Sequence, residues 1–219
     1  MYSFVSIASA ALMCISSHYF AGPLKYNVLI SGSKVGSATV LVSGNDATGY
    51  QEEATVELKK DGHSFTQHQV DHYGRNGTST STFTTFNVDG HSASITANFT
   101  KTGAEVSLVS DGKAVPKKTV PMLANLPHLD VSHLWFSHVR PAVGTSLTFQ
   151  SFSSQDATWH KETAKYVGTK TIQVGGKSYS AHEISESGDQ GASTVYLDDQ
   201  GNLVKGTQAG NVTIELASR

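Results

Sequence analysis

Hydrophobic and polar residues alternate with a period of two along most of the chain after residue 23. The clearest example contains Ala54, Val56 and Leu58, because the intervening residues Thr55 and Glu57 are polar. This alternation is typical of a β-strand that has one packed face and one solvated face. Along the whole chain it predicts about twelve strands in two runs, with an interruption between them.

Short turn signals separate the expected strands. Asp-Gly and Asn-Gly pairs supply the positive φ angles that two-residue hairpin turns require. In the first run these pairs are Asp61-Gly62, Asn76-Gly77, Asp89-Gly90 and Asp111-Gly112. Sequential hairpins of this kind predict an all-β fold, mainly an antiparallel meander, in the form of a curved sheet or half-barrel. A two-sheet β-sandwich is the alternative that the same alternation permits.

The interruption, at about residues 116–141, is rich in proline and predicts one short helix. Asp130 can cap the start of this helix, and Pro141 can end it. Its apolar positions follow the helical spacing i, i+3, i+4 and i+7, and they are Val131, Leu134, Trp135 and His138. We therefore expect a single β-rich domain over residues 22–219 that carries one helical insertion.

Residues 1–21 are expected to form an export signal. Residues 4–15 are an apolar stretch of the length of a signal-peptide core, and the small residues Ser16 and Ser17 follow it. This stretch is shorter than the ~20 apolar residues of a membrane span. The alternative is a short buried strand or helix, which the lack of a basic residue before Lys25 favours. The expected location is periplasmic or extracellular.

Composition excludes one broad class of function. The formal net charge is −2, and charged residues make up 16 % of the chain, against ~25 % in average soluble proteins. Nucleic-acid binding needs a surplus of Lys and Arg that neutralises phosphates. The chain has no such surplus, so no nucleic-acid partner is expected.

The ten histidines do not predict a metal site. His68 and His72 share a strand face, but four residues along a strand span about 13 Å. His128, His133 and His138 are five residues apart and cannot converge from one regular helix. The chain also lacks the nucleophile-elbow, zinc-protease, P-loop and dinucleotide motifs. We therefore expect no metal and no cofactor, and the sequence favours a protein without enzymatic activity.

Several segments carry a family resemblance. They are the opening strand 26–30 with Val35-Gly36, the glycine-turn hairpin 166–184, and the stretch 193–205 with its Tyr-Leu-Asp-Asp motif. On these segments the chain resembles exported bacterial β-proteins of unassigned function, which are distantly similar to the periplasmic lipoprotein-carrier (Lol-type) half-barrels. The resemblance implies a curved sheet around an apolar cavity, with a helical segment over its mouth, and it implies no catalytic residue.

The leading hypothesis is an exported, non-enzymatic protein that binds a lipid, an acyl chain or another apolar small molecule in this cavity. One alternative is an interaction or scaffold module with a protein partner in the cell envelope. A hydrolase or metal enzyme built on the histidines is the least favoured alternative, and the oligomeric state stays open. The candidate residues of the cavity and its lid are Tyr26, Phe65, Phe83, Phe86, Phe99, Val131, Leu134, Trp135, Phe149 and Tyr196.

Overall fold

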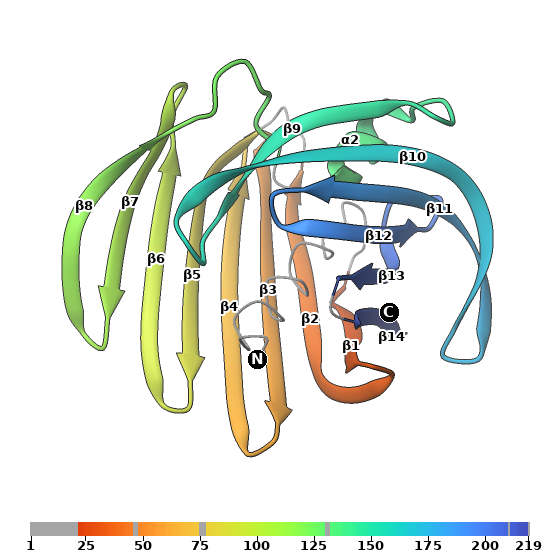
Figure 1. Ribbon diagram of the computed structural model, residues 1–219, viewed down its shortest axis with the longest axis horizontal. Helices are drawn as coiled ribbons and strands as arrows, with labels where there is room; N and C mark the ends of the chain where they lie inside the picture. The colour runs from red at the N-terminus through yellow and green to blue at the C-terminus, as the bar shows by residue number, and fades with distance from the viewer. Residues whose placement is uncertain (1–21, 46–47, 75–77, 130–131, 210, 219) are drawn as a thin grey trace.

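A computed structural model of the chain describes residues 22–45, 48–74, 78–129, 132–209 and 211–218. Fourteen β-strands of these residues form one antiparallel sheet (Figure 1). This confirms the all-β, antiparallel expectation. The β-sandwich alternative is wrong, because every described strand hydrogen-bonds into the same sheet.

The first eight strands form the first run of the chain, and the last six form the second. The first run is β1 (Leu24–Ile30), β2 (Ser33–Asn45), β3 (Gly49–Lys60), β4 (His63–Tyr73), β5 (Ser79–Val88), β6 (His91–Phe99), β7 (Gly103–Ser110) and β8 (Lys113–Pro121). The helix α2 (Ser132–Val139) follows it. The second run is β9 (Ser146–Ser153), β10 (Thr158–Val174), β11 (Lys177–Gly188), β12 (Gly191–Leu197), β13 (Leu203–Gln208) and β14 (Val212–Ser218).

The two runs join where the chain's first and last strands pair. Each run is a meander of consecutive hairpins, and β1 pairs with β14 in the middle of the sheet. This pairing sets Tyr26 opposite Leu216 and Val28 opposite Ile214, so the apolar positions of both strands lie on the same face. The sheet does not close, and β8 and β9 are its two ends.

The expected hairpin turns form at the Asp-Gly pairs. In the turn between β3 and β4, Asp61 has a φ of 52° and Gly62 a φ of 83°. Asp89-Gly90 and Asp111-Gly112 repeat this geometry. Two consecutive positive φ angles define a type I′ turn, whose twist matches that of the flanking strands.

The insertion is shorter than expected, because Lys113–Pro121 forms the strand β8 instead of opening it. Pro116 and Pro121 suggested a break, since proline cannot donate a hydrogen bond to a sheet. An edge strand tolerates proline, because one of its sides has no ladder, and β8 is an edge strand. The expected helix is confirmed as α2, within one or two residues of the predicted ends.

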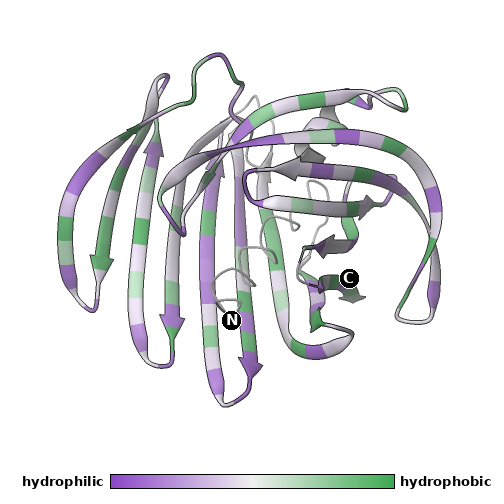
Figure 2. Cartoon of the chain, in the orientation of Figure 1, coloured by the Kyte–Doolittle hydropathy of each residue, from purple (hydrophilic) through white to green (hydrophobic). Residues whose placement is uncertain are grey.

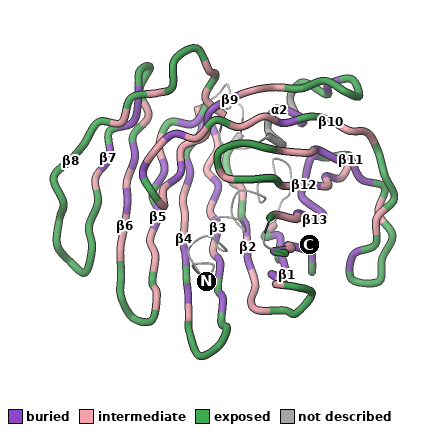
Figure 3. The backbone as a smooth tube through the Cα atoms, viewed as in Figure 1, coloured by how far each residue is buried: buried purple, intermediate pink, exposed green. Residues whose placement is uncertain are grey.

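One face of the sheet, which we call the inner face, carries the core. Tyr26, Val28 and Phe65 belong to it, and they share one cluster with Phe149 of β9 and Phe136 of α2. The sheet therefore curls so that its two halves and α2 pack against each other. Hydrophobic and hydrophilic residues alternate along the strands in Figure 2, and buried positions alternate with more exposed ones in Figure 3.

Side chains connect the two ends of the open sheet. Trp159 of β10 donates from Nε1 to the carbonyl oxygen of Val120 in β8, at 3.1 Å. Trp159 also packs with Ile95 and Ala104 of β6 and β7, and the half-buried Phe152 of β9 packs against the same cluster. A second core therefore bridges the gap without backbone pairing between β8 and β9.

The segment after β8 covers the edge of β9. The buried side chain of Gln150 in β9 donates to the carbonyl oxygens of Leu123 and Leu126, and its Oε1 accepts from the backbone N–H of Leu123. The backbone of the same segment pairs with β9 next to His128. These bonds fix the path by which the chain crosses from one end of the sheet to the other.

Candidate functional site

The inner face of β3, β4 and β5 carries a row of polar side chains inside the otherwise apolar core. In β4, the odd-numbered residues share the face of Phe65, because side chains alternate along a strand. The cross-strand register brings polar residues of β3 and β5 beside them. We define the inner polar patch as Glu52, Gln67, Gln69, Asp71, Thr82 and Thr84.

Hydrogen bonds run along β4 toward a carboxylate. Gln67 donates from Nε2 to Oε1 of Gln69 at 3.2 Å, and Gln69 donates from Nε2 to Oδ2 of Asp71 at 2.7 Å. Thr84 adds a third bond from its hydroxyl to Oε1 of Gln69, at 3.4 Å. These three bonds use N–H and O–H donors of the patch within the patch itself.

Gln67 and Thr82 of the patch each keep an unsatisfied polar atom in the interior. Gln67 is 2 % exposed and Thr82 is 5 % exposed. Within the described part of the chain, Oε1 of Gln67 and Oγ1 of Thr82 have no hydrogen-bond partner. Leaving a buried polar atom unsatisfied costs about 1–3 kcal/mol, and native proteins contain few such atoms. The patch therefore offers buried acceptor atoms to a hydrogen-bond donor from outside the protein.

A second group of carboxylates lies on the inner face of the other run. Glu162 of β10 and Glu186 of β11 share the face of the core residues beside them, and Glu186 accepts a hydrogen bond from the Ser193 hydroxyl. Burial, followed by repulsion from Glu186, raises the pKa of Glu162 from 4.5 to about 7. Oε1 of Glu162 and Oε1 of Gln208 have no partner among the described residues.

The helix α2 is held over the inner face by a tyrosine, a histidine and an aspartate. The Phe136 ring lies 5.0 Å from the Tyr166 ring and 4.8 Å from the His182 ring. The Tyr166 hydroxyl bonds to Nδ1 of His182 at 2.9 Å, and Nε2 of His182 bonds to Asp199 at 2.9 Å. Arg140 lies over the Phe136 ring and donates to the backbone of Asp199. Because Tyr166 is buried beneath Phe136, this chain of bonds anchors the helix.

A family model for a domain of unknown function, DUF6134, matches residues 26–216. The chain belongs to this family. Among solved structures, the DUF6134 domain is similar to a "Beta-barrel-like Protein of Domain of Unknown Function DUF1849" from Brucella abortus. The TM-score is 0.66 at 12 % identity, over 90 % of this chain and 95 % of that chain. This likeness supports a β-barrel-like fold.

A second solved structure, a DUF1089 family protein from Pseudomonas aeruginosa, matches the DUF6134 domain less well. It has a TM-score of 0.43 and 8 % identity, over 76 % of this chain and 87 % of that chain. No match was found among curated proteins.

Five of the ten predicted site residues lie on or against the inner face of the DUF6134 domain. Tyr26, Phe65 and Phe149 are almost fully buried in the main core, and Trp135 of α2 joins them. Phe86 is half-buried and packs against both core clusters.

Phe99 lies apart from these five residues, near the gap between the ends of the sheet. Its ring is 4.8 Å from that of His128, 5.5 Å from that of Phe152 and 5.6 Å from that of Trp159. It therefore belongs to the aromatic cluster that bridges the two ends.

Phe83 and Tyr196 lie on the outer face, against the expectation that they line the cavity. Phe83 is opposite Val70 and is 40 % exposed, because the neighbouring even-numbered residues of β5 take the inner face. Tyr196 lies between the inward residues of β12 for the same reason. Val131 falls outside the described residues, and so does the side chain of Leu134.

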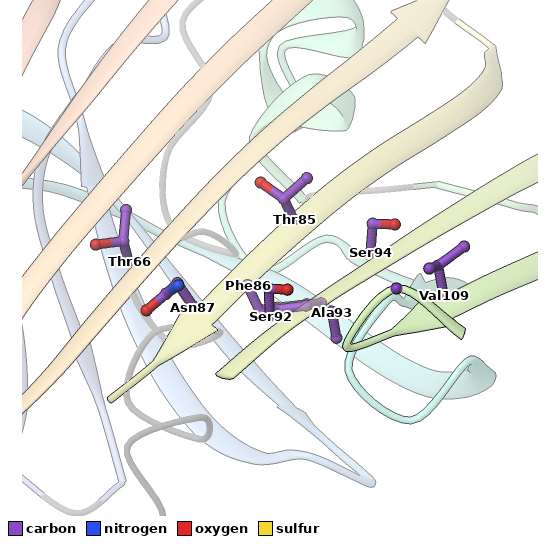
Figure 4. A pocket seen from close by; sticks show the side chains of 9 residues that line it. Thr66, Thr85, Phe86, Asn87, Ser92, Ala93, Ser94 and Val109 are labelled. Carbon is purple, nitrogen blue, oxygen red and sulfur yellow. The ribbon is translucent and has the colours of Figure 1, made fainter. Parts of the chain in front are cut away.

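The DUF6134 domain also has hollows on its outer face. One of about 360 Å³ lies near the ends of β4 to β7 and is shown in Figure 4. Uncharged side chains line it, among them Thr66, Thr85, Asn87, Ser92 and Val109. Another of about 550 Å³ lies near the opposite ends of β2 to β5.

In the part of the chain that the structure describes, no three His, Cys, Asp or Glu side chains are placed to hold a metal ion. No helix there is long and apolar enough to cross a membrane. Sequence reasoning considered the histidines and missed the inner polar patch, which alternates with them along β4.

Proposed function

We propose that this DUF6134 domain is a non-enzymatic binding protein that holds a small molecule with an apolar body, such as a lipid or acyl chain, against its inner face. The observation that carries the proposal is the pair of buried, unsatisfied atoms on Gln67 and Thr82. An interior that served packing alone would gain stability from apolar residues at these positions.

The architecture suits such a role. The sheet is open between β8 and β9, and side chains such as Trp159 bridge its ends. Side chains change rotamers far more readily than a sheet breaks its backbone ladder. The helix α2, which packs on the core through Trp135 and Phe136, is the proposed lid.

Mass spectrometry of the purified protein tests this proposal. The protein is purified without detergent and then extracted with an organic solvent. The compounds in the solvent are identified, and the extracted protein is kept for a binding assay. We expect a stoichiometric lipid or acyl compound, and the extracted protein should bind the neutral fluorescent probe N-phenyl-1-naphthylamine with saturation. A ligand-free protein that does not bind the probe would refute the proposed function.

The proposal includes export to the periplasm or the cell exterior, in keeping with the resemblance to lipoprotein carriers. Its support is the apolar stretch at residues 4–15, with the small residues that follow it. The intact mass of the protein recovered from fractionated cells tests it. Loss of about the first 21 residues supports export, whereas a full-length protein in the cytoplasmic fraction contradicts it.

An interaction module remains the second candidate because of one row on the outer face. Leu41, Val70 and Phe83 lie in cross-strand register over β2, β4 and β5, with Glu53 between the first two. Leu41 and Phe83 are each 40 % exposed. A partner that binds this row should be lost in the double variant Leu41→Ser and Phe83→Ser, while probe binding at the inner face stays unchanged.

A further inference from the structure

We propose that the ligand carries a cationic group rich in N–H donors, an ammonium or guanidinium on an apolar body, and that the inner polar patch binds this group. The inference rests on the proposed function and names the class of ligand for the same site. Three observations on the patch and one on the second run of strands support it.

The first observation is the direction of the hydrogen bonds. Gln67 donates to Gln69, and Gln69 donates to Asp71, so each amide N–H₂ group already has an acceptor. The unsatisfied atom at the start of this chain is Oε1 of Gln67, which can only accept. A ligand that satisfies the patch must therefore bring donors. A carboxylate or phosphate group would set further acceptors against Oε1 of Gln67, and the Thr82 hydroxyl is the one unsatisfied group among these two that can donate to it.

The second observation is the sign of the buried charge. Glu52 and Asp71 face each other in register across β3 and β4, and both are buried. Carboxylates removed from water are stabilised by a nearby positive charge, and hydrogen bonding to a cation is roughly twice as strong as between neutral groups.

The third observation is what borders the patch. Gln67 stands between Val56 of β3 and Phe86 of β5 in the cross-strand register. Gln69 has Ala54 on one side, and the next row of β6 contributes Ile95. A molecule whose charged end reaches Gln67 and Asp71 would therefore place an apolar body along these neighbours.

The fourth observation comes from the other run of strands. The inner face of β10 and β11 carries Glu162 and Glu186, and Oε1 of Glu162 is a further buried atom without a hydrogen-bond partner among the described residues. The repulsion of Glu186 contributes to the raised pKa of Glu162. Both polar regions of the inner face therefore contain acidic groups, which favour a cationic ligand over an anionic one.

A set of ligands that share one alkyl chain tests the inference on the full-length protein. The affinities of dodecylamine, dodecanol and dodecanoate are measured by their displacement of N-phenyl-1-naphthylamine at neutral pH, at concentrations too low for micelles to form. Dodecylamine should bind at least about tenfold more tightly than dodecanol, and dodecanoate most weakly, because a tenfold change corresponds to one good charge-assisted hydrogen bond. Dodecyltrimethylammonium, which has the charge without N–H donors, should lie between the amine and the alcohol.

Variants assign this preference to the patch. Gln67→Met and Asp71→Asn should each reduce the preference for amine over alcohol to about threefold or less, with little change for the alcohol. The matched control is Gln51→Met, since Gln51 lies on the outer face of β3, opposite His72. It should keep the full preference. Thr82→Val tests the same patch if the Gln67 variant fails to fold.

The outcomes separate the two proposals. If dodecanoate or dodecanol binds as tightly as the amine, the assignment of a cationic group is wrong while the proposed binding function stands. If the amine preference survives Gln67→Met and Asp71→Asn, the patch is not its origin. If neither the probe nor any of the alkyl compounds binds, both the inference and the proposed function are refuted.

Discussion

Replacing Gln67 by methionine should stabilise the ligand-free protein, although it removes a hydrogen bond. Gln67 is 2 % exposed, and its Oε1 has no partner among the described residues. Methionine has nearly the same length and volume, and it fills the site without a strong acceptor. A residue that lowers stability where it stands is the behaviour expected of a ligand-binding group and not of a packing group.

The magnitude follows from two opposing contributions. Removing a buried, unsatisfied carbonyl oxygen recovers about 1–3 kcal/mol. Losing the 3.2 Å bond from Gln67 to Gln69 costs about 0.5–1.5 kcal/mol. Oε1 of Gln69 keeps its bond from the Thr84 hydroxyl, so the substitution leaves it with a donor. The free energy of unfolding should therefore rise by ~1 kcal/mol.

Urea unfolding, followed by tryptophan fluorescence, measures this change. The transition midpoint should move to higher urea with an unchanged m-value, because the surface exposed on unfolding stays the same. Gln51→Met on the outer face is the control and should change the free energy of unfolding by less than ~0.5 kcal/mol. A Gln67→Met protein that is less stable than the parent by ~1 kcal/mol or more would refute the reasoning, because the amide would then be part of a satisfied network.

Three further predictions concern other parts of the fold. In the urea assay, Phe136→Ala should lower the free energy of unfolding by ~3–5 kcal/mol, because the ring is 2 % exposed. The control Val139→Ala, at a side chain that is 61 % exposed, should change this free energy little. Because the pKa of Glu162 is raised from 4.5 to about 7, the folded protein keeps a proton that the unfolded chain releases. Full conversion of this pKa change corresponds to ~3.4 kcal/mol, and water screens the partly exposed carboxyl, so stability should fall by ~2 kcal/mol as the pH rises through that window. Glu162→Gln should abolish this fall in pH-dependent thermal melts. Gly36→Ala should destabilise by ~3 kcal/mol in urea titrations, because its Cβ would lie 2.0 Å from the Glu57 carbonyl oxygen; an unchanged midpoint would show that β2 and β3 can separate locally.

Local signals predicted most of the fold, because each hairpin is encoded within a few residues. The alternation around Val56 places one strand, and the pair Asp61-Gly62 ends it with a type I′ turn. The pairing of β1 with β14 could not be read in this way. It joins Tyr26 to Leu216, and no local pattern specifies a partner so distant in sequence. For the same reason, the alternation permitted a sandwich as well as a single curled sheet.

The face of an aromatic residue was harder to predict than its strand. In β5, Phe83 points outward and Phe86 points inward. The two residues are equally hydrophobic, so hydrophobicity alone does not predict which of them faces the core. Only the partners decide the orientation, because Phe83 lies opposite Val70 whereas Phe86 lies opposite the buried Gln67. In β12, Tyr196 is one residue from two buried aliphatic residues, and the larger aromatic side chain wrongly suggested a cavity wall.

The inner polar patch escaped notice because β4 is polar on both of its faces. The histidines drew attention to the outer face, where Nε2 of His68 bonds to Glu53 at 2.9 Å in an ordinary surface pair. The residues that alternate with the histidines, Gln67, Gln69 and Asp71, were not predicted as a site, although β4 lies well inside the sheet. A strand in that position has to turn one of its two polar rows into the interior. The burial of such a row lowers stability unless its hydrogen bonds are satisfied, and Oε1 of Gln67 is not satisfied. A strand that is polar on both faces and is flanked by strands with one apolar face is therefore itself a sequence signal for a binding surface, and it directs attention to the alternate residues rather than to the histidines.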